Sequence, residues 1–117
     1  MKTGTDIVDN SRFLRAVTRN DGRLRERLFS PEELAREPED LDFAVMFSAK
    51  ESVVKALGTG FDSSLSWHDI KIFVNGSDVE VLLSGMALEL AGTSKVLLSA
   101  SQSQKTSLTF ALLIEGE

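Results

Sequence analysis

Two carboxylates and two lysines are the residues of this chain whose types and spacing best suit chemistry. Asp6 lies near the N-terminus, and Glu51 lies between Lys50 and Lys55 within residues 43–61, FAVMFSAKESVVKALGTGF. Two carboxylates could hold a hard divalent cation such as Mg²⁺ through oxygen, and lysines could neutralise phosphate charge. For Glu51 and Lys55 the simpler alternative is an ordinary i,i+4 helix ion pair, which stabilises by roughly 0.2–0.5 kcal/mol. Asp6 is likewise either solvent-facing or a ligand.

Lys50 is not explained by that simpler alternative. At about 100° per residue, the apolar residues of this stretch fall on one helical face, and Lys50 falls in its middle; the apolar residues are Phe43, Met46, Phe47, Val53, Val54 and Leu57. A lysine in an apolar face costs free energy unless its ammonium finds a partner or reaches water. We therefore predict that the Lys50 ammonium reaches a cleft or a neighbouring subunit and does not end in the core.

The turn Gly58-Thr59-Gly60 ends the same stretch and has two interpretations. Its backbone N–H groups could bind a phosphate, or Gly58 could simply cap the helix, as glycine commonly does. Other chemistry has little support, because the chain contains no cysteine and one histidine, His68. A cysteine nucleophile and a cysteine-based zinc site are thereby excluded, and a Ser-His-Asp arrangement would depend on His68 alone.

The first half of the chain must supply one strand and three helices to position these residues. Residues 3–9 are predicted as a short strand and residues 10–20 as a helix. Ser30-Pro31-Glu32-Glu33 has the pattern of a capped helix start, and Pro38 interrupts that helix. A long central helix then runs from about Leu41 to Gly58.

The second half alternates between apolar and polar residues and reads mainly as strands. Strands are predicted over residues 65–74 and 79–83 about the hairpin signal Asn75-Gly76, and a short helix follows Ser84 and ends at Gly92. Two more strands span residues 95–101 and 106–114. The order β-α-α-α-β-β-α-β-β predicts an α+β fold, a largely antiparallel sheet with the long central helix packed on it and its helices on one side.

Length and charge limit the classes of protein to which the chain could belong. Its 117 residues suit a single domain, 1–117. The net charge of −5 argues against general nucleic-acid binding. No run approaches the roughly 18 apolar residues of a membrane span, and the N-terminus lacks the apolar segment of a signal peptide, so we expect a soluble, cytoplasmic protein without a membrane partner.

Positive charge is concentrated between Arg12 and Arg27, where six arginines face only two acidic residues. The arginines are residues 12, 15, 19, 23, 25 and 27, and acidic residues crowd the stretch 32–42 that follows. This cluster is either a solvated helix face or a docking patch for an acidic partner, whose association would be steered by charge and weakened by salt.

Motifs along nearly the whole chain resemble one known family. GTDIV (4–8), FSAKE (47–51), KALGTG (55–60), SWHDI (66–70) and VLLSG (81–85) occur in the order and spacing of the holo-acyl-carrier-protein synthases. These are short, single-domain 4′-phosphopantetheinyl transferases. The resemblance implies the 4′-phosphopantetheinyl transferase-like fold. It also implies transfer of phosphopantetheine from coenzyme A to a serine hydroxyl of an acyl carrier protein, with release of adenosine 3′,5′-bisphosphate.

The resemblance also implies roles for individual residues. Asp6 and Glu51 would bind Mg²⁺ on the pyrophosphate, Glu51 would in addition act as the base through water, and Lys55 would lie near the phosphates. The coenzyme A site would include, by position, Lys50, Lys55, Gly58, Thr59, Gly60 and Gln102. The family is typically a homotrimer with sites between subunits. Its acidic carrier protein docks on basic residues that correspond to Arg12, Arg23 and Arg27, which favours the docking interpretation of the arginine cluster.

Three positions depart from the family pattern near the expected nucleotide. Met46 replaces an arginine, Ser77-Asp78 follows the hairpin turn in place of a proline, and Gln102 replaces a histidine. Two of these changes remove a potentially cationic contact, because glutamine cannot carry positive charge. The sequence therefore predicts weaker coenzyme A binding or an unusual substrate choice. Two alternatives remain open: a binding or assembly module of the same fold that has lost turnover, and an unrelated small α+β domain.

Overall fold

The computed structural model describes residues 1–61 and 64–116. The elements, in chain order, are β1 (Lys2–Asp9), α1 (Asn10–Val17), η1 (Asn20–Gly22), α2 (Arg23–Leu28), α3 (Pro31–Leu34), α4 (Asp40–Leu57), η2 (Trp67–Asp69), β2 (Ile70–Asn75), β3 (Asp78–Leu83), α5 (Gly85–Ala91), β4 (Lys95–Gln102) and β5 (Thr106–Ile114). Among the described residues, none of the helices combines the length and apolar character needed to cross a bilayer.

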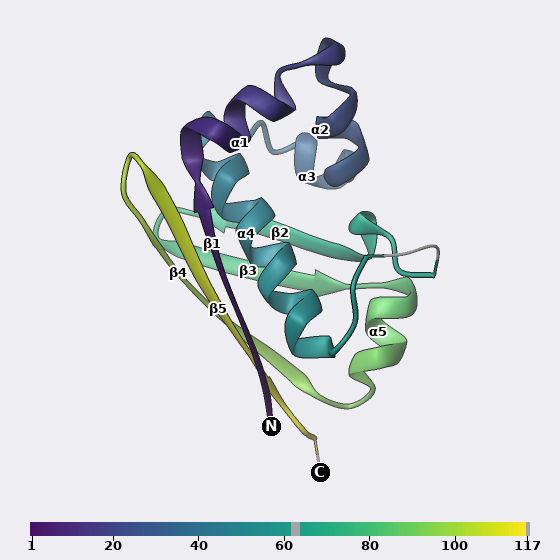
Figure 1. Ribbon diagram of the computed structural model, residues 1–117. Coiled ribbons are helices and arrows are strands. Elements are labelled where there is room, and N and C mark those ends of the chain that lie inside the picture. The colour runs from purple at the N-terminus through teal and green to yellow at the C-terminus, as the bar shows by residue number, and fades with distance from the viewer. Residues whose placement is uncertain (62–63, 117) are drawn as a thin grey trace.

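The predicted α+β fold is confirmed, with the strands divided between two antiparallel sheets. One sheet has the order β1-β5-β4 and the other is the hairpin β2-β3. Helix α4 packs against β1 and β5 and also against β2, and Figure 1 shows it at the centre of the molecule with α1, α2 and α3 gathered at its N-terminal end. The central helix thus lies between elements from both halves of the chain.

Burial surrounds α4 almost completely, which differs from the single apolar face expected from its sequence. Ala44, Ser48 and Ser52 are buried in addition to the predicted apolar residues, of which Phe47 alone is only half-buried. On the sheet side, the Ser48 and Ser52 hydroxyls lie 2.8 and 2.6 Å from Thr109 Oγ1 of β5. A helix that packs on several sides needs small and hydrogen-bonded side chains where backbones approach closely, and these two serines meet that need.

Gly4 allows α4 to lie directly on β1. A Cβ atom at Gly4 would overlap the carbonyl oxygen of Ser52 and would lie 2.8 Å from the backbone nitrogen of Ala56. Only a residue without a side chain fits such an approach. The contact brings the middle of β1, where Asp6 lies, against the turn of α4 that carries Glu51 and Lys55.

One local prediction was wrong, and one helix was missed. Residues 65–69 are not part of a strand, because Ser66 and Asp69 cap each other reciprocally and form the turn η2, so that β2 begins only at Ile70. The pattern Ser-x-x-Asp is itself a capping signal that the apolar alternation obscured. Residues 23–28, for which no element was predicted, form the short helix α2.

Candidate active site

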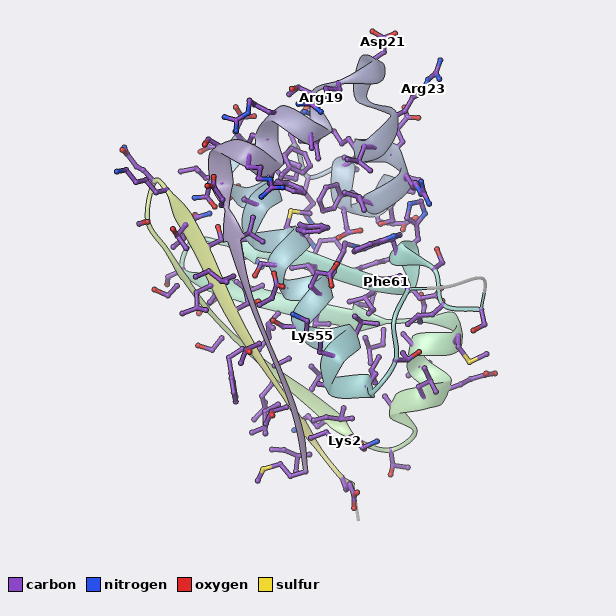
Figure 2. The ribbon with its side chains drawn as sticks, viewed as in Figure 1. Lys2, Arg19, Asp21, Arg23, Lys55 and Phe61 are labelled. Atoms are coloured by element: carbon purple, nitrogen blue, oxygen red, sulfur yellow. The ribbon has the colours of Figure 1, made fainter. Side chains whose placement is uncertain are left out.

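Asp6 and Lys55, both expected in the site but not as an ion pair, meet across the β1–α4 contact. Lys55 Nζ lies 3.1 Å from Asp6 Oδ1 and donates a second hydrogen bond of 2.9 Å to the carbonyl oxygen of Thr5. The Asp6 side chain is only 14% exposed, whereas that of Lys55 is 49% exposed and reaches the surface, where Figure 2 shows it pointing from α4 towards β1. The lysine is therefore held by the strand and is not limited to a pair within its own helix.

Glu51 lies beside this pair in an unfavourable electrostatic environment. The side chain is partly buried, and burial raises its pKa, as does the negative charge of Asp6, while Lys55 opposes the rise. The second carboxylate oxygen of Asp6, Oδ2, is buried and has no hydrogen-bond partner. Buried carboxylate oxygens are normally satisfied, so this one is available to a ligand.

The carboxylates of Asp6 and Glu51 suit a divalent cation with few protein ligands. A bound cation would give the unpartnered oxygen of Asp6 a partner and would reduce the repulsion between the two carboxylates. Within residues 1–61 and 64–116, no group of three acidic, histidine or cysteine side chains could enclose a metal. Mg²⁺ commonly takes one or two carboxylates and completes its shell with water and substrate phosphates, which fits this donor set.

The Gly58–Gly60 turn first of all ends α4. Gly58 has a left-handed φ of 82°, its N–H donates to the Lys55 carbonyl, and the N–H of Thr59 donates to the Val54 carbonyl. These two N–H groups are consequently occupied, and the helix-cap interpretation of Gly58 is confirmed. Gly58 and Gly60 are both exposed, and a Cβ atom at either glycine would meet no atom within 4 Å, so the turn is open on its outer side.

A column of aromatic rings holds the segment that follows this turn. The Phe61 ring stacks on Trp67 at 3.6 Å between centroids, and the column continues through Phe47 and Phe13, at 5.5 and 4.7 Å. Next to Trp67, the Nε2 atom of His68 is hydrogen-bonded to the Glu26 carbonyl at 2.9 Å. His68 therefore joins η2 to α2, which gives the single histidine a structural role.

The prediction for Lys50 was wrong. Its side chain has no exposed surface, and its ammonium forms a 2.9 Å ion pair with Glu33 of α3. Nζ also donates to the carbonyl oxygens of Trp67, at 2.9 Å, and Ile70. Burial lowers the pKa of Lys50 to about 8, although Glu33 raises it. The predicted coenzyme A contact of Lys50 is contradicted within this chain, because the ammonium has all three protons bound in the core.

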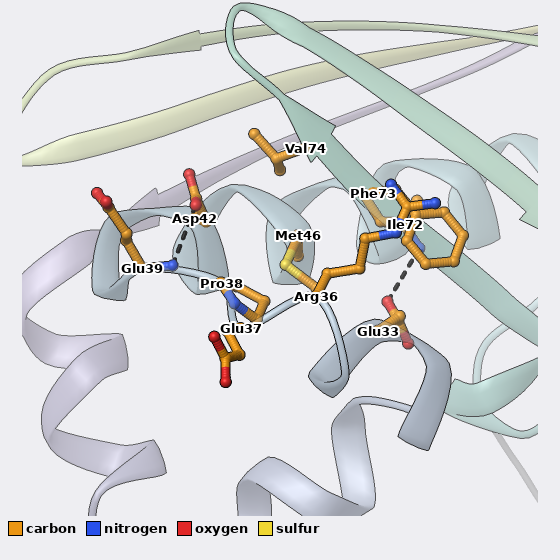
Figure 3. Close-up of a pocket in the computed structure, with 10 residues that line it drawn as sticks. All are labelled: Glu33, Arg36, Glu37, Pro38, Glu39, Asp42, Met46, Ile72, Phe73 and Val74. Carbon is orange, nitrogen blue, oxygen red and sulfur yellow. Dashed lines mark hydrogen bonds between the residues drawn. The ribbon is translucent and has the colours of Figure 1, made fainter.

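Glu33 was missed as the partner of Lys50. The capping pattern correctly predicted its position in α3, where Oε1 accepts the Ser30 N–H at 2.9 Å. Its Oε2 atom accepts the N–H of Ile72 at 2.9 Å, the contact drawn in Figure 3. One carboxylate thus accepts hydrogen bonds from the start of a helix, from a strand and from a lysine. Only the first donor is close to Glu33 in the sequence.

The three departures from the family pattern lie in three different parts of the fold. Met46 is 1% exposed and lines a cavity of about 190 Å³ with α3 and β2 residues (Figure 3). Gln102 Nε2 donates to the Leu41 carbonyl at 2.7 Å and to the Ser107 hydroxyl at 2.8 Å. Asp78 is exposed at the start of β3. Met46 therefore lies on the α3–β2 side of α4 and Asp78 at the start of β3, whereas Gln102 joins the first turn of α4 to β5, next to the end of β1.

The arginine cluster forms a groove between α1 and α2. Arg23 and Arg27 line it together with Arg19, Ala16 and Leu24, and Arg19 and Arg23 project from the helical end of the molecule in Figure 2. Arg12 is exposed at the start of α1 and does not line the groove. Arg19 was missed as a groove residue, although its spacing of three and four residues from α1 neighbours already placed it on this face.

Comparisons with known proteins agree on one family. Residues 2–109 match the model of the 4′-phosphopantetheinyl transferase superfamily. The holo-[acyl-carrier-protein] synthase of Geotalea daltonii is 41% identical over 120 residues, covering 95% of each chain, and that of Chlamydia pneumoniae is 37% identical over 115 residues, covering 95% of this chain and 94% of its own.

Solved structures give the same result for the fold. The synthase of Neisseria meningitidis matches with a TM-score of 0.82 at 32% identity, covering 97% of this chain and 98% of its own. The Helicobacter pylori synthase, solved in complex with coenzyme A, matches with a TM-score of 0.83 at 26% identity, covering 95% and 98%.

Proposed function

Because the chain belongs to the 4′-phosphopantetheinyl transferase superfamily, as a relative of the holo-acyl-carrier-protein synthases, we propose that it transfers phosphopantetheine from coenzyme A to a serine of an acyl carrier protein. The serine oxygen forms a bond to the phosphorus that carries pantetheine, the bond from that phosphorus to the bridging pyrophosphate oxygen breaks, and adenosine 3′,5′-bisphosphate leaves. The single observation that carries this proposal is the cluster of Asp6, Glu51 and Lys55 on the β1 side of α4.

Each residue of the cluster has a role that follows from its environment. Asp6 and Glu51 hold Mg²⁺, which supplies charge neutralisation at the pyrophosphate when bound. Lys55 is positioned by Thr5 and Asp6 and places its positive charge beside the phosphates. Glu51 accepts the serine proton through water.

The nucleotide end of coenzyme A is expected to bind through a second copy of the chain. Met46 lies on the α3–β2 side of α4 in one protomer, away from Asp6 on β1, so a ligand that contacts both Met46 and Asp6 needs two protomers. Gly58 and Gly60 are the open positions of the turn, and Thr59 lies between them. Met46 and Gln102 offer no positive charge there, and we expect coenzyme A to bind more weakly than with cationic residues at these positions.

The exposed face of the three-stranded sheet supports a homotrimer. Its large apolar residues point away from α4 into solvent: Ile7, Leu97, Leu108, Phe110 and Ile114, with Ile7 68% and Phe110 43% exposed. Contiguous apolar surface on a folded protein commonly marks an interface. Sedimentation velocity tests this assignment: we expect a trimer for the wild type and loss of that species in Phe110→Glu.

The carrier protein is proposed to dock on the arginine groove through Arg23 and Arg27, with Arg12, which is exposed on α1 outside the groove, as a further contact. The groove is basic in a chain with a net charge of −5, so its charge is local and suits an acidic surface. Association should weaken as salt screens the charges.

The test of the proposed function is a transfer assay. Pure protein is incubated with coenzyme A, Mg²⁺ and several apo acyl carrier proteins, the cognate one included, and each carrier is then measured by intact mass. We expect a phosphopantetheine mass gain that disappears in Glu51→Ala. The absence of any mass gain on all carriers would reject transfer, and binding of coenzyme A without transfer would instead favour a module that has lost turnover.

A further inference from the structure

We propose that the buried pair Lys50–Glu33 is a positioning device that sets the geometry between Glu51 and the Gly58–Gly60 turn. This inference rests on the proposed function, because that geometry affects catalysis only if Glu51 and the turn belong to the active site. Lys50 and Glu33 do not touch the candidate site and are not catalytic residues. They act through the two elements whose places they fix, α4 and η2.

The first link runs through the rotation of α4. Ser48 and Ser52 attach one side of the helix to Thr109 of β5, and Lys50 attaches a nearly opposite side to α3 and β2. At about 100° per residue, Glu51 projects between these two attachments. A helix held on two sides cannot rotate about its axis, so the neighbouring carboxylate is kept towards Asp6.

The second link runs through η2 to the turn after α4. The Lys50 ammonium binds the carbonyls of Trp67 and Ile70, the first residue of η2 and the first of β2. The Trp67 ring stacks on Phe61 at 3.6 Å, and Phe61 directly follows Gly60. One ammonium thus fixes the ring on which the end of the glycine turn rests.

The hydrogen bonds of Lys50 and Glu33 connect four elements and leave no proton of the ammonium free. Lys50 has three protons and three acceptors, and Glu33 accepts from Ser30, Lys50 and Ile72. Well-packed apolar residues often replace a buried ion pair without loss of stability. The charged pair instead contributes directional hydrogen bonds, which hold α3, α4, η2 and β2 at fixed distances from one another. Residues around an active site commonly hold catalytic residues in place in this way.

The experiment replaces both charges at once, in the double variant Lys50→Met/Glu33→Leu, so that no buried charge is left unpaired. Trp67 is the only tryptophan of the chain, so intrinsic fluorescence and acrylamide quenching report on its stack directly. We expect a red-shifted emission and greater quenching. We also expect kcat to fall by roughly 10- to 100-fold, as for misplaced catalytic groups, while KM for the carrier protein stays unchanged.

The matched control is Leu113→Ala, which removes buried volume at the far end of β5. It should lower the melting temperature without changing Trp67 quenching or kcat. Glu33→Gln, which keeps an oxygen acceptor for Ser30 or Ile72, serves if the double variant does not fold and should shift both readouts in the same direction. Wild-type quenching or wild-type kcat in a folded variant would overturn the proposal. If the wild type transfers nothing, the proposed function fails, and the quenching result alone decides the positioning role.

Discussion

The two long sides of α4 hold lysines and carboxylates in opposite ways. On the α3–β2 side, Lys50 and Glu33 are fully buried and every hydrogen-bonding position of the ammonium is filled. On the β1 side, Lys55 is half exposed, Asp6 keeps an unpartnered oxygen, and Glu51 has a raised pKa. Every charged group named on the buried side has its hydrogen-bonding partners, whereas the β1 side keeps a carboxylate oxygen without one.

This difference separates structure from function within one helix. A satisfied charge has no capacity left for a ligand, whereas an unsatisfied carboxylate stores a free-energy cost that a ligand can remove. The two sides share the segment Lys50-Glu51, so neighbouring residues in the sequence perform different tasks. Comparing matched substitutions on the two sides is the most direct way to test this interpretation.

The largest effect is expected from Lys50→Met on the buried side. The methionine fits the volume of the lysine stem but leaves Glu33 as a buried, unpaired carboxylate. Removing one partner of a buried pair typically costs about 3–5 kcal/mol. Urea unfolding of the variant and the wild type measures this loss, and a loss below about 1 kcal/mol would show that the Glu33 charge is not confined as the contacts indicate.

Gly4→Ala should have the next largest effect and should affect the β1 side alone. Its methyl group would collide with the backbone of α4 at Ser52 and Ala56, and backbone cannot move aside as a side chain can. Overpacking of this kind costs about 1–3 kcal/mol or more. Thermal unfolding gives the loss of stability, and Mg²⁺ calorimetry should show weaker binding because Asp6 is pushed away from Glu51. An unchanged Mg²⁺ affinity would contradict the importance of this close approach.

The sequence predicted the features of the fold that depend on neighbouring residues. The helix end at Gly58, the capped start at Ser30 and the hairpin at Asn75-Gly76 all follow from local backbone chemistry, and each is present. Asp6 and Lys55 were also expected in one site, through the family resemblance.

Lys50 shows why the remainder could not be predicted. Helical periodicity placed it correctly on an apolar face, and the cost of burying it was stated correctly. Its actual partners, Glu33 and the carbonyls of Trp67 and Ile70, lie 17 to 20 residues away in the sequence. Such partners are determined by how α3 and η2 pack, which no local pattern specifies.

Lys55→Met is the matched counterpart of Lys50→Met and should change stability far less. The ion pair with Asp6 is half exposed on the lysine side, and exposed pairs contribute about 0–1 kcal/mol. Transfer activity should nevertheless fall, by roughly 100-fold, as when a charge-stabilising donor is removed from an active site. Stability and kcat measured on the same two variants give the contrast: Lys50→Met loses stability together with kcat, whereas Lys55→Met loses kcat with little loss of stability. The reverse pattern would exchange the roles of the two sides.

Glu51→Gln should have the smallest effect on stability, and in the opposite direction. The pKa of Glu51 is raised in the folded protein, so folding favours the protonated form, and this contribution is lost as the pH rises through the folded-state pKa. At neutral pH the ionised carboxylate is therefore destabilising, and glutamine should raise the free energy of unfolding by less than about 1 kcal/mol, because solvent screens the partly exposed group.

The pH dependence of that gain gives the sharpest distinction. As the pH falls below the folded-state pKa, the wild type becomes protonated and resembles glutamine, so the difference in melting temperature should vanish in acid. Mg²⁺ at neutral pH should also reduce the difference in melting temperature. It binds to and stabilises the ionised wild type, whereas the variant offers the ion one carboxylate fewer. Melting curves at several pH values, with and without Mg²⁺, measure both trends. If the wild type is more stable than Glu51→Gln at neutral pH without Mg²⁺, the ionised Glu51 carboxylate is stabilised by its neighbours. The contrast with the fully paired Lys50 side would then be wrong.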